Sequence, residues 1–263
     1  MRKSTGLFII LLLLSACGSV PLTGRKQVML VSDQEVLSSS LTQYNNFLKE
    51  AAISTDKAQT DKVLRVGRNI AAATEAYLRN NGLEAELKNF AWEFNYVKSN
   101  EANAFCMPGG KIVVYEGIMP FAPADAELAA VLGHEVAHAV ARHASERMSQ
   151  QMLAQYGGLV LEQAVSGTSS STQTIANTVY GLGAQYGLML PYSRRHEYEA
   201  DHMGLIFMAM AGYDPRAAIS FWTKMSQGKT ASVPEFMSTH PSDANRIAEL
   251  QKYLPDALKY YRR

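Results

Sequence analysis

His134-Glu135-Val136-Ala137-His138 is the stretch of sequence that decides how this 263-residue chain folds and what it can bind. Residues four apart lie one turn apart on the same helix face, so both histidines can offer a ring nitrogen to one metal ion. The carboxylate of Glu135 projects beside them, where it can take a proton from a water molecule at the metal. The spacing therefore predicts a zinc-binding helix that carries its own general base.

The residues around this motif indicate a buried helix. The sequence from about Glu127 to Met148 is apolar on nearly every side and predicts one continuous helix. Two histidines on a solvated helix face are the alternative, but a buried His-Glu-His set needs partners because unpaired buried charge is costly. Gly133 is the one glycine in this stretch, and it allows another element to approach closely.

A catalytic zinc site needs a third protein ligand and keeps one position open for water or substrate. The metzincin pattern is excluded, because Ala141 and Ala144 stand where it requires Gly and His. His143 lies five residues past His138, about 140° round a continuous helix, so it is expected to point away from the metal.

Acidic residues of a second predicted helix are the candidates for the third zinc ligand. Glu197 and Asp201 are four residues apart and share a helix face. Glu197 is the predicted third ligand, and Asp201 is expected to accept a hydrogen bond from the outer N–H of a ligating histidine. Glu199 is expected to face a neighbouring arginine or solvent. A charged surface helix is the alternative for this segment, and His196 and His202 are rival ligands that rank lower.

The motif followed by Glu-x-x-x-Asp resembles the gluzincin metallopeptidases, in the family that holds the CAAX prenyl protease and HtpX. Its bacterial lipoprotein and periplasmic branch, which includes BepA and LoiP, is the most similar. Residues 103–115 resemble the family's Asn-Ala…Pro-Gly-Gly strand region, and residues 238–242 with Arg246 resemble its late His-Pro motif. The resemblance spans about residues 60–255. It implies a zincin-like domain with one zinc ion held by His134, His138 and Glu197.

His240 in the late His-Pro motif has three interpretations. Pro241 biases its backbone to an extended conformation, which indicates a loop. The imidazole could hydrogen-bond the oxyanion of a tetrahedral intermediate, with Arg246 a weaker candidate for the same anion. It could instead occupy the open zinc position and silence the enzyme, as the resemblance to BepA implies. A plain turn histidine ahead of a helix from Ser242 is the third interpretation.

The N-terminus has the pattern of a lipoprotein signal peptide. Two basic residues precede a short apolar run, and Leu14-Ser15-Ala16-Cys17 fits the bacterial lipobox. The sequence predicts a signal peptide over residues 1–16 and a tether over 17–31 that is held in a bilayer by lipid on Cys17. An ordinary secretory signal with a chance cysteine is the alternative.

Gly18 predicts where such a lipoprotein would be sorted. A residue other than Asp after Cys17 resembles lipoproteins of the outer membrane, so the expected location is the periplasmic face of that membrane. An inner-membrane or extracellular location follows if the sorting rule differs.

Composition sets further limits. Residues 32–263 are long enough for one domain with a sizeable core. A net charge of +1 gives no indication of a nucleic-acid partner. Cys106 is the one thiol besides Cys17, so the domain has no internal disulfide, and its apolar neighbours indicate a buried side chain without a catalytic role.

The coarse pattern is α+β and mostly helical, with a small sheet beside the zinc helix. Helices are expected over 32–52 and 56–80, and strands over 90–96 and 111–115. The segment around 103–105 or 112–115 is expected to bind substrate as an added β-strand, with an ordinary interior strand as the alternative. Residues 153–190 form a long insert, either a lid over the cleft, a helical hairpin that touches membrane or partners, or plain core helices. Its apolar runs are too short to predict a membrane span.

Taken together, the sequence predicts a membrane-anchored zinc metalloendopeptidase that hydrolyses proteins or peptides. Misfolded or misassembled cell-envelope proteins are the expected substrates, from resemblance and location. The alternative is an envelope assembly factor or chaperone with a latent zinc site, in contact with the envelope assembly machinery. Glu135 favours the enzyme, since a structural site needs no base.

Overall fold

The computed structural model describes residues 17–185, 189–227, 236–237, 240 and 245–262. The strands are β1 (Cys17–Ser19), β2 (Lys26–Val28), β3 (Glu93–Val97), β4 (Ala104–Met107) and β5 (Lys111–Tyr115). The helices of the first half are α2 (Asp33–Glu50), α3 (Lys57–Asn80), η1 (Glu84–Asn89) and η2 (Glu116–Ile118). Those of the second half are α4 (Asp125–Val140), α5 (His143–Val165), α6 (Ser170–Ala184), α7 (Leu190–Met210), α8 (Arg216–Gln227) and α10 (Arg246–Ala257). Helix dominates and the sheets are small, which confirms the predicted α+β class.

The three-stranded sheet determines which strand can meet a substrate. Its order is β3-β5-β4, with β5 parallel to β3 and antiparallel to β4. Because β5 is paired on both sides, residues 112–115 cannot add a substrate strand, and that alternative is wrong. Strand β4, which contains Ala104 and Phe105, is the outermost strand of this sheet on the side of α4.

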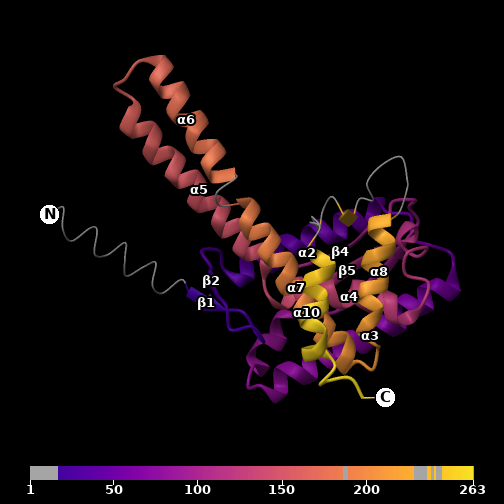
Figure 1. Ribbon diagram of the computed structural model, residues 1–263. Coiled ribbons are helices and arrows are strands. Elements are labelled where there is room, and N and C mark those ends of the chain that lie inside the picture. The colour runs from indigo at the N-terminus through magenta and orange to yellow at the C-terminus, as the bar shows by residue number, and fades with distance from the viewer. Residues whose placement is uncertain (1–16, 186–188, 228–235, 238–239, 241–244, 263) are drawn as a thin grey trace.

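Helix α4, which carries the histidine motif, is buried between other helices. It packs against α7, α3 and α8 (Figure 1). Where α4 crosses α7, a Cβ atom added to Gly133 would lie 2.8 Å from the carbonyl oxygen of Gly204, which is too close for any side chain. The expected close approach at Gly133 is therefore confirmed, and it brings the backbones of the two helices into contact.

The predicted continuous helix from Glu127 to Met148 is wrong. Helix α4 ends at Val140, Arg142 has a left-handed backbone with φ of 56°, and α5 starts at His143. The Arg142 guanidinium forms ion pairs with Asp33, at 3.3 Å, and with Glu86. Neither partner is close in sequence, so tertiary contacts hold a conformation that local sequence disfavours.

Helices α5 and α6 form an antiparallel hairpin that projects from the body of the protein, and α7 returns the chain to the core (Figure 1). The β1–β2 ribbon lies at its base, where the backbone N–H of Leu30 donates to Ser149 Oγ at 2.8 Å. Within the described residues, no helix combines the length and the hydropathy that crossing a membrane requires.

Candidate metal centre

Four side chains from three segments converge on one point. The ligand atoms of His134, His138, Glu197 and His240 all lie within 4.8 Å of one another. His134 Nε2 is 3.0 Å from His138 Nε2 and 3.2 Å from His240 Nδ1. Glu197 Oε2 is 3.3 Å from His134 Nε2 and 3.1 Å from His240 Nδ1. The predicted ligands are therefore brought together, and His240 joins them.

This set fits a zinc ion. Zinc–nitrogen bonds of about 2.0–2.1 Å in a tetrahedron place neighbouring ligand atoms about 3.3–3.4 Å apart. The separations given above match that spacing. Oε1 of Glu135 and Oε1 of Glu197 are both buried without a hydrogen bond to any described protein atom, although such atoms are normally satisfied. A cation between the imidazoles would satisfy the Glu197 oxygen.

Glu135 is held beside the ligands by the edge strand. Its Oε2 accepts a hydrogen bond of 3.0 Å from the backbone N–H of Cys106 in β4, and its Oε1 lies 3.3 Å from His240 Nε2. Burial raises the pKa of the Glu135 carboxyl above its usual value, even though the charges of His240 and His134 oppose this shift. A raised pKa suits a group that must accept a proton and then release it.

Asp201 lies behind the metal ligands and pairs with Arg246. Its Oδ1 is 3.0 Å from Nδ1 of His134, and both of its oxygens accept 2.8 Å hydrogen bonds from the Arg246 guanidinium. That guanidinium stacks on the ring of Trp222 and is 1% exposed. The sequence made Arg246 a weaker candidate for a hydrogen bond to the oxyanion of the tetrahedral intermediate. The structure instead places it where it neutralises the carboxylates of Asp201 and Glu197.

The charges of this cluster act on its titratable groups. Burial raises the pKa of Glu197, but the charge of His138 and hydrogen bonds from His134, His138 and His240 outweigh it and hold that pKa well below its usual value. For His134 burial lowers the pKa, yet hydrogen bonds to Asp201 and Glu197 raise it to about 9. Protons and a divalent cation therefore compete for the same site, because both are attracted by the same carboxylates.

His143 is not one of the four clustered ligands, but it contacts the outer nitrogen of one of them, which the sequence did not predict. Its Nδ1 is 2.8 Å from Nδ1 of His138, and its Nε2 is 3.1 Å from Glu199 Oε2. The break at Arg142 is the cause, because the angle of 140° applies only to a continuous helix. Glu199 likewise faces the interior, and it accepts hydrogen bonds from Thr23 and Arg25.

Arg25 connects the N-terminal ribbon to this inner layer. It binds Glu146 through two hydrogen bonds, of 2.8 and 2.6 Å, and Glu199 through one of 2.7 Å. Glu146 also lies 2.9 Å from His196 Nε2, and His196 stacks on His143. His196 is therefore buried behind the metal ligands. No local pattern in the sequence of residues 17–31 indicates this role for Arg25.

Two other candidates lie outside the cluster of ligands. His202 lies in the middle of α7 and faces α10, where it pairs with Asp256 at 2.9 Å and stacks on Tyr253. Cys106 is half-buried in β4, and burial raises the pKa of its thiol well above the usual value. A thiol in that state is a poor nucleophile.

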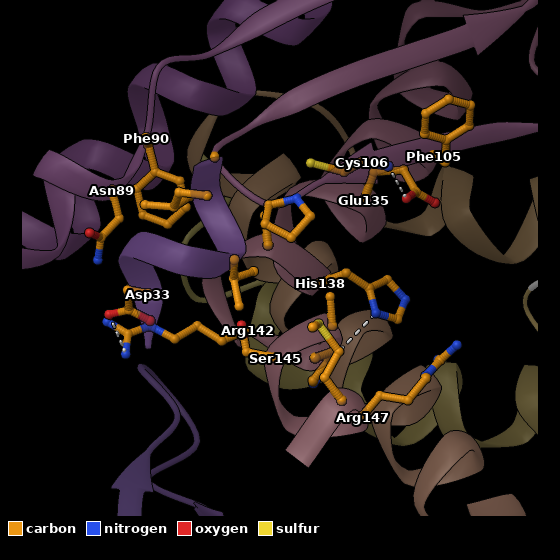
Figure 2. A pocket seen from close by; sticks show the side chains of 18 of the residues that line it. Asp33, Asn89, Phe90, Phe105, Cys106, Glu135, His138, Arg142, Ser145 and Arg147 are labelled. Carbon is orange, nitrogen blue, oxygen red and sulfur yellow. Dashed lines mark hydrogen bonds and ion pairs between the residues drawn. The ribbon is translucent and has the colours of Figure 1, made fainter. Parts of the chain in front are cut away.

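A pocket opens beside Glu135 and His138, with a cavity volume of about 380 Å³. Figure 2 shows these two residues on one side and Phe90 and Asp33 on the other. Most of its lining surface is apolar. The apolar residues lie on α2, β4, α4 and α5 and directly after η1 and β4: Val36, Leu37, Phe90, Phe105, Pro108, Ala139 and Met148.

Comparison with known proteins agrees with this geometry. Residues 65–254, which include all four candidate ligands, match peptidase family M48. The chain belongs to peptidase family M48. The family match, together with the cluster of His134, His138, Glu197 and His240, confirms the predictions of a metallopeptidase and of zinc as its cofactor.

The chain is similar to mitochondrial metalloendopeptidase OMA1. The Arabidopsis thaliana protein is 39% identical over 180 residues, 68% of this chain and 35% of that protein. Metalloendopeptidase OMA1 of Homo sapiens is 28% identical over 263 residues, 98% of this chain and 49% of that protein. The β-barrel assembly-enhancing protease of Escherichia coli is 28% identical over 169 residues, 60% of this chain and 33% of that protein. The chain thus spans about half or less of the length of these curated relatives.

These relatives overturn the predicted location. An exported lipoprotein at the periplasmic face of the outer membrane was expected from Gly18, but the OMA1 relatives, which match over most of the chain, are mitochondrial proteins. One residue after a cysteine is too short a pattern to determine a compartment. The finer resemblance to the bacterial lipoprotein and periplasmic branch is not confirmed, whereas the family is.

Proposed function

We propose that this chain is a zinc-dependent endopeptidase in which His134, His138 and Glu197 hold the metal. The convergence of these three ligand atoms beside the Glu135 carboxylate carries the proposal. A bound zinc ion would act there as a Lewis acid, lowering the pKa of water and polarising the substrate carbonyl. Asp201 fixes the ring of His134 through its Nδ1, so that Nε2 faces the metal.

Glu135 performs the proton transfers. Its Oε1 has no hydrogen-bond partner among the described residues, while Oε2 is held by the backbone of Cys106. The free oxygen takes the proton from the attacking water and delivers it to the leaving nitrogen.

The substrate lies along β4. Because the N–H of Cys106 points to Glu135 rather than to β5, the alternate backbone groups of β4 face α4 and the pocket. An extended peptide can donate its N–H groups to the outward carbonyl oxygens of this edge, while the N–H of Cys106 still holds Glu135, and can place one side chain in the pocket. The apolar lining and the volume of about 380 Å³ suit a large apolar side chain next to the scissile bond.

His240 regulates access to the metal. Its Nδ1 lies among the other ligand atoms, and a fourth protein ligand would fill the position that a catalytic site leaves open. The same observation favours a second candidate function, an assembly factor or chaperone with a latent zinc site. The two differ in whether removal of His240 releases peptidase activity.

We also propose how the chain is anchored and which proteins it cleaves. Acylation of Cys17 would anchor the chain in a bilayer, with residues 1–16 removed as a signal peptide and 32–263 forming the peptidase domain. Misfolded or misassembled proteins are the proposed substrates. Similarity to a protein named for β-barrel assembly supports this class of substrate.

The test compares casein cleavage and bound zinc in the detergent-solubilised full chain and its variants. Glu135→Gln should keep zinc and lose cleavage by a factor of about a hundred or more, with exposed Glu84→Gln as the matched control. Glu197→Ala should lose zinc. His240→Ala should keep zinc and cleave faster if His240 gates the site, and slower if it binds the oxyanion. Full zinc content without cleavage in any variant would favour the assembly factor.

A further inference from the structure

The α5–α6 hairpin carries most of the exposed large hydrophobic side chains in the described part of the chain. Of eleven large hydrophobic side chains that are exposed in the described part of the chain, eight belong to it. They are Met148, Leu153, Tyr156, Leu159, Val160, Ile175, Val179 and Leu182. Val160 is 70% exposed and Val179 is 65% exposed, so these side chains do not contribute to the core. Exposed apolar side chains gathered in this way indicate an interaction surface.

The hairpin is an ordered unit that the core does not cover. No residue from 151 to 185 is buried. The two helices hold each other, since the Tyr180 hydroxyl donates to the carbonyl oxygen of Ala154 at 2.6 Å and its ring lies over Gly157. The apolar face is therefore presented on a preformed scaffold that extends away from the body (Figure 1).

Charge is almost absent from this surface. Glu162 is the single charged residue between Arg147 and Arg194, whereas charged residues make up 19% of the whole chain. Apart from Glu162 and the tyrosines, the polar residues of α5 and α6 beyond Arg147 are Ser, Thr, Gln and Asn. A protein-binding surface is normally surrounded by a polar rim with charged groups. Apolar side chains that face no opposing charge can be buried at the boundary between lipid headgroups and acyl chains, where binding strength scales with the buried apolar area.

We propose that the α5–α6 hairpin embeds its apolar side chains in the surface of a lipid bilayer. It lies in the interface rather than crossing it, in agreement with the lengths and hydropathy of α5 and α6. Because the embedded part carries one charge, binding depends on apolar burial and needs no anionic lipid.

The charges at the base of the hairpin agree with this orientation. Arg147, Arg194 and Arg195 are exposed where α5 leaves the body and α7 returns to it. Guanidinium groups at that level can bind the phosphates of any phospholipid. The pocket is lined by the first turns of α5, up to Met148 and Gln151. If the proposed peptidase function holds, its cleft would therefore face substrates that lie close to the bilayer.

A local probe tests this proposal independently of the N-terminus and of catalysis. The full chain with Cys17→Ser and Cys106→Ser carries one environment-sensitive dye, at Val160→Cys or Val179→Cys. A control variant carries it at Leu41→Cys, a position on α2 that is 47% exposed. Each protein is mixed with phosphatidylcholine vesicles at low and at high salt. Quenching is then measured with iodide in water and with nitroxide-labelled lipid, and circular dichroism checks that each variant is folded.

The proposal predicts that vesicles reduce iodide quenching at residues 160 and 179 about fivefold or more, at both salt concentrations, while residue 41 is unchanged. Nitroxide lipid should quench the two hairpin dyes. Val160→Glu should make the dye at residue 179 accessible to iodide again in the presence of vesicles, whereas Leu41→Glu should leave that dye protected. Dyes that stay accessible to iodide in the presence of vesicles would overturn the proposal and favour a protein partner. Protection that grows with protein concentration without vesicles would also overturn it, in favour of a second copy of the chain.

Discussion

Arg246→Met tests whether the guanidinium stabilises the ligand cluster when zinc has been removed by a chelator. Arg246 is 1% exposed and makes two 2.8 Å hydrogen bonds to Asp201, whose carboxylate is itself 3% exposed. It also lies 3.4 Å from Glu197 Oε2. Removing it leaves two carboxylates buried in one place, Asp201 with the ring of His134 and Glu197 with the three metal-site imidazoles as remaining partners.

The expected loss of unfolding free energy in Arg246→Met follows from this burial. Removing one partner of a buried ion pair typically costs about 3–5 kcal/mol, because the other charge stays desolvated. We therefore expect metal-free Arg246→Met to lose about 3–5 kcal/mol of unfolding free energy. Zinc should restore much of this loss, since its charge neutralises the same carboxylates, and binding at a thousand times the dissociation constant stabilises by about 4 kcal/mol.

Urea denaturation in EDTA and in excess zinc measures both effects. Arg216→Met is the matched control, because the Arg216 side chain is 54% exposed, pairs with Asp214 on the surface and should change stability by about 1 kcal/mol or less. Asp201→Asn combined with Arg246→Met should lose less than the sum of the single variants. A loss of under about 1 kcal/mol for Arg246→Met in EDTA would refute the reasoning.

Two further predictions concern the layer behind the metal. His143→Ala should weaken zinc binding about 10–100-fold because His138 loses the ring that orients it. His202→Ala should not, because the His202 side chain pairs with Asp256 of α10 instead of with a metal ligand. Equal affinities of the two variants in a chelator competition assay would contradict this. Burial raises the pKa of Glu146, but His196 and Arg25 outweigh it and hold the pKa at about 2, below the usual 4.5. The stability that Glu146 contributes is therefore full above about pH 4.5 and is lost as the pH falls towards 2, by up to about 3 kcal/mol. Urea denaturation at pH 7 and at pH 3 should show Glu146→Gln to be less stable than wild type at pH 7 and less sensitive to acid. If Glu146→Gln lost as much stability between pH 7 and pH 3 as wild type does, Glu146 would not be the source of the acid-dependent stability.

The parts of the site that sequence could predict are those fixed by helix geometry alone. His134 and His138, like Glu197 and Asp201, are four residues apart, and a helix places such pairs on one face whatever surrounds it. The capping box of Ser32 and Glu35 also forms as this local pattern requires.

The parts that sequence could not predict depend on contacts between distant residues. The helix break at Arg142 is stabilised by Asp33 and Glu86, and it alone turns His143 towards His138. Arg25 lies more than a hundred residues from Glu146 and Glu199. Neither helix propensity nor hydrophobic periodicity reports such contacts. The sequence therefore could not predict that Arg25 packs behind the metal centre.

The crossing of α4 and α7 explains why the long insert between them can project from the protein. Gly133 precedes His134 directly, and Gly204 lies two turns beyond Glu197, so the glycine contact sets the distance between the two ligand-bearing helices. A larger residue at either glycine would push the helices apart and separate ligand atoms that now lie within 4.8 Å of each other. Because this contact positions Glu197 directly, α5 and α6 need not hold the two halves of the site together. Their outer surface is therefore free to carry apolar side chains that a buried connection would have placed in the core.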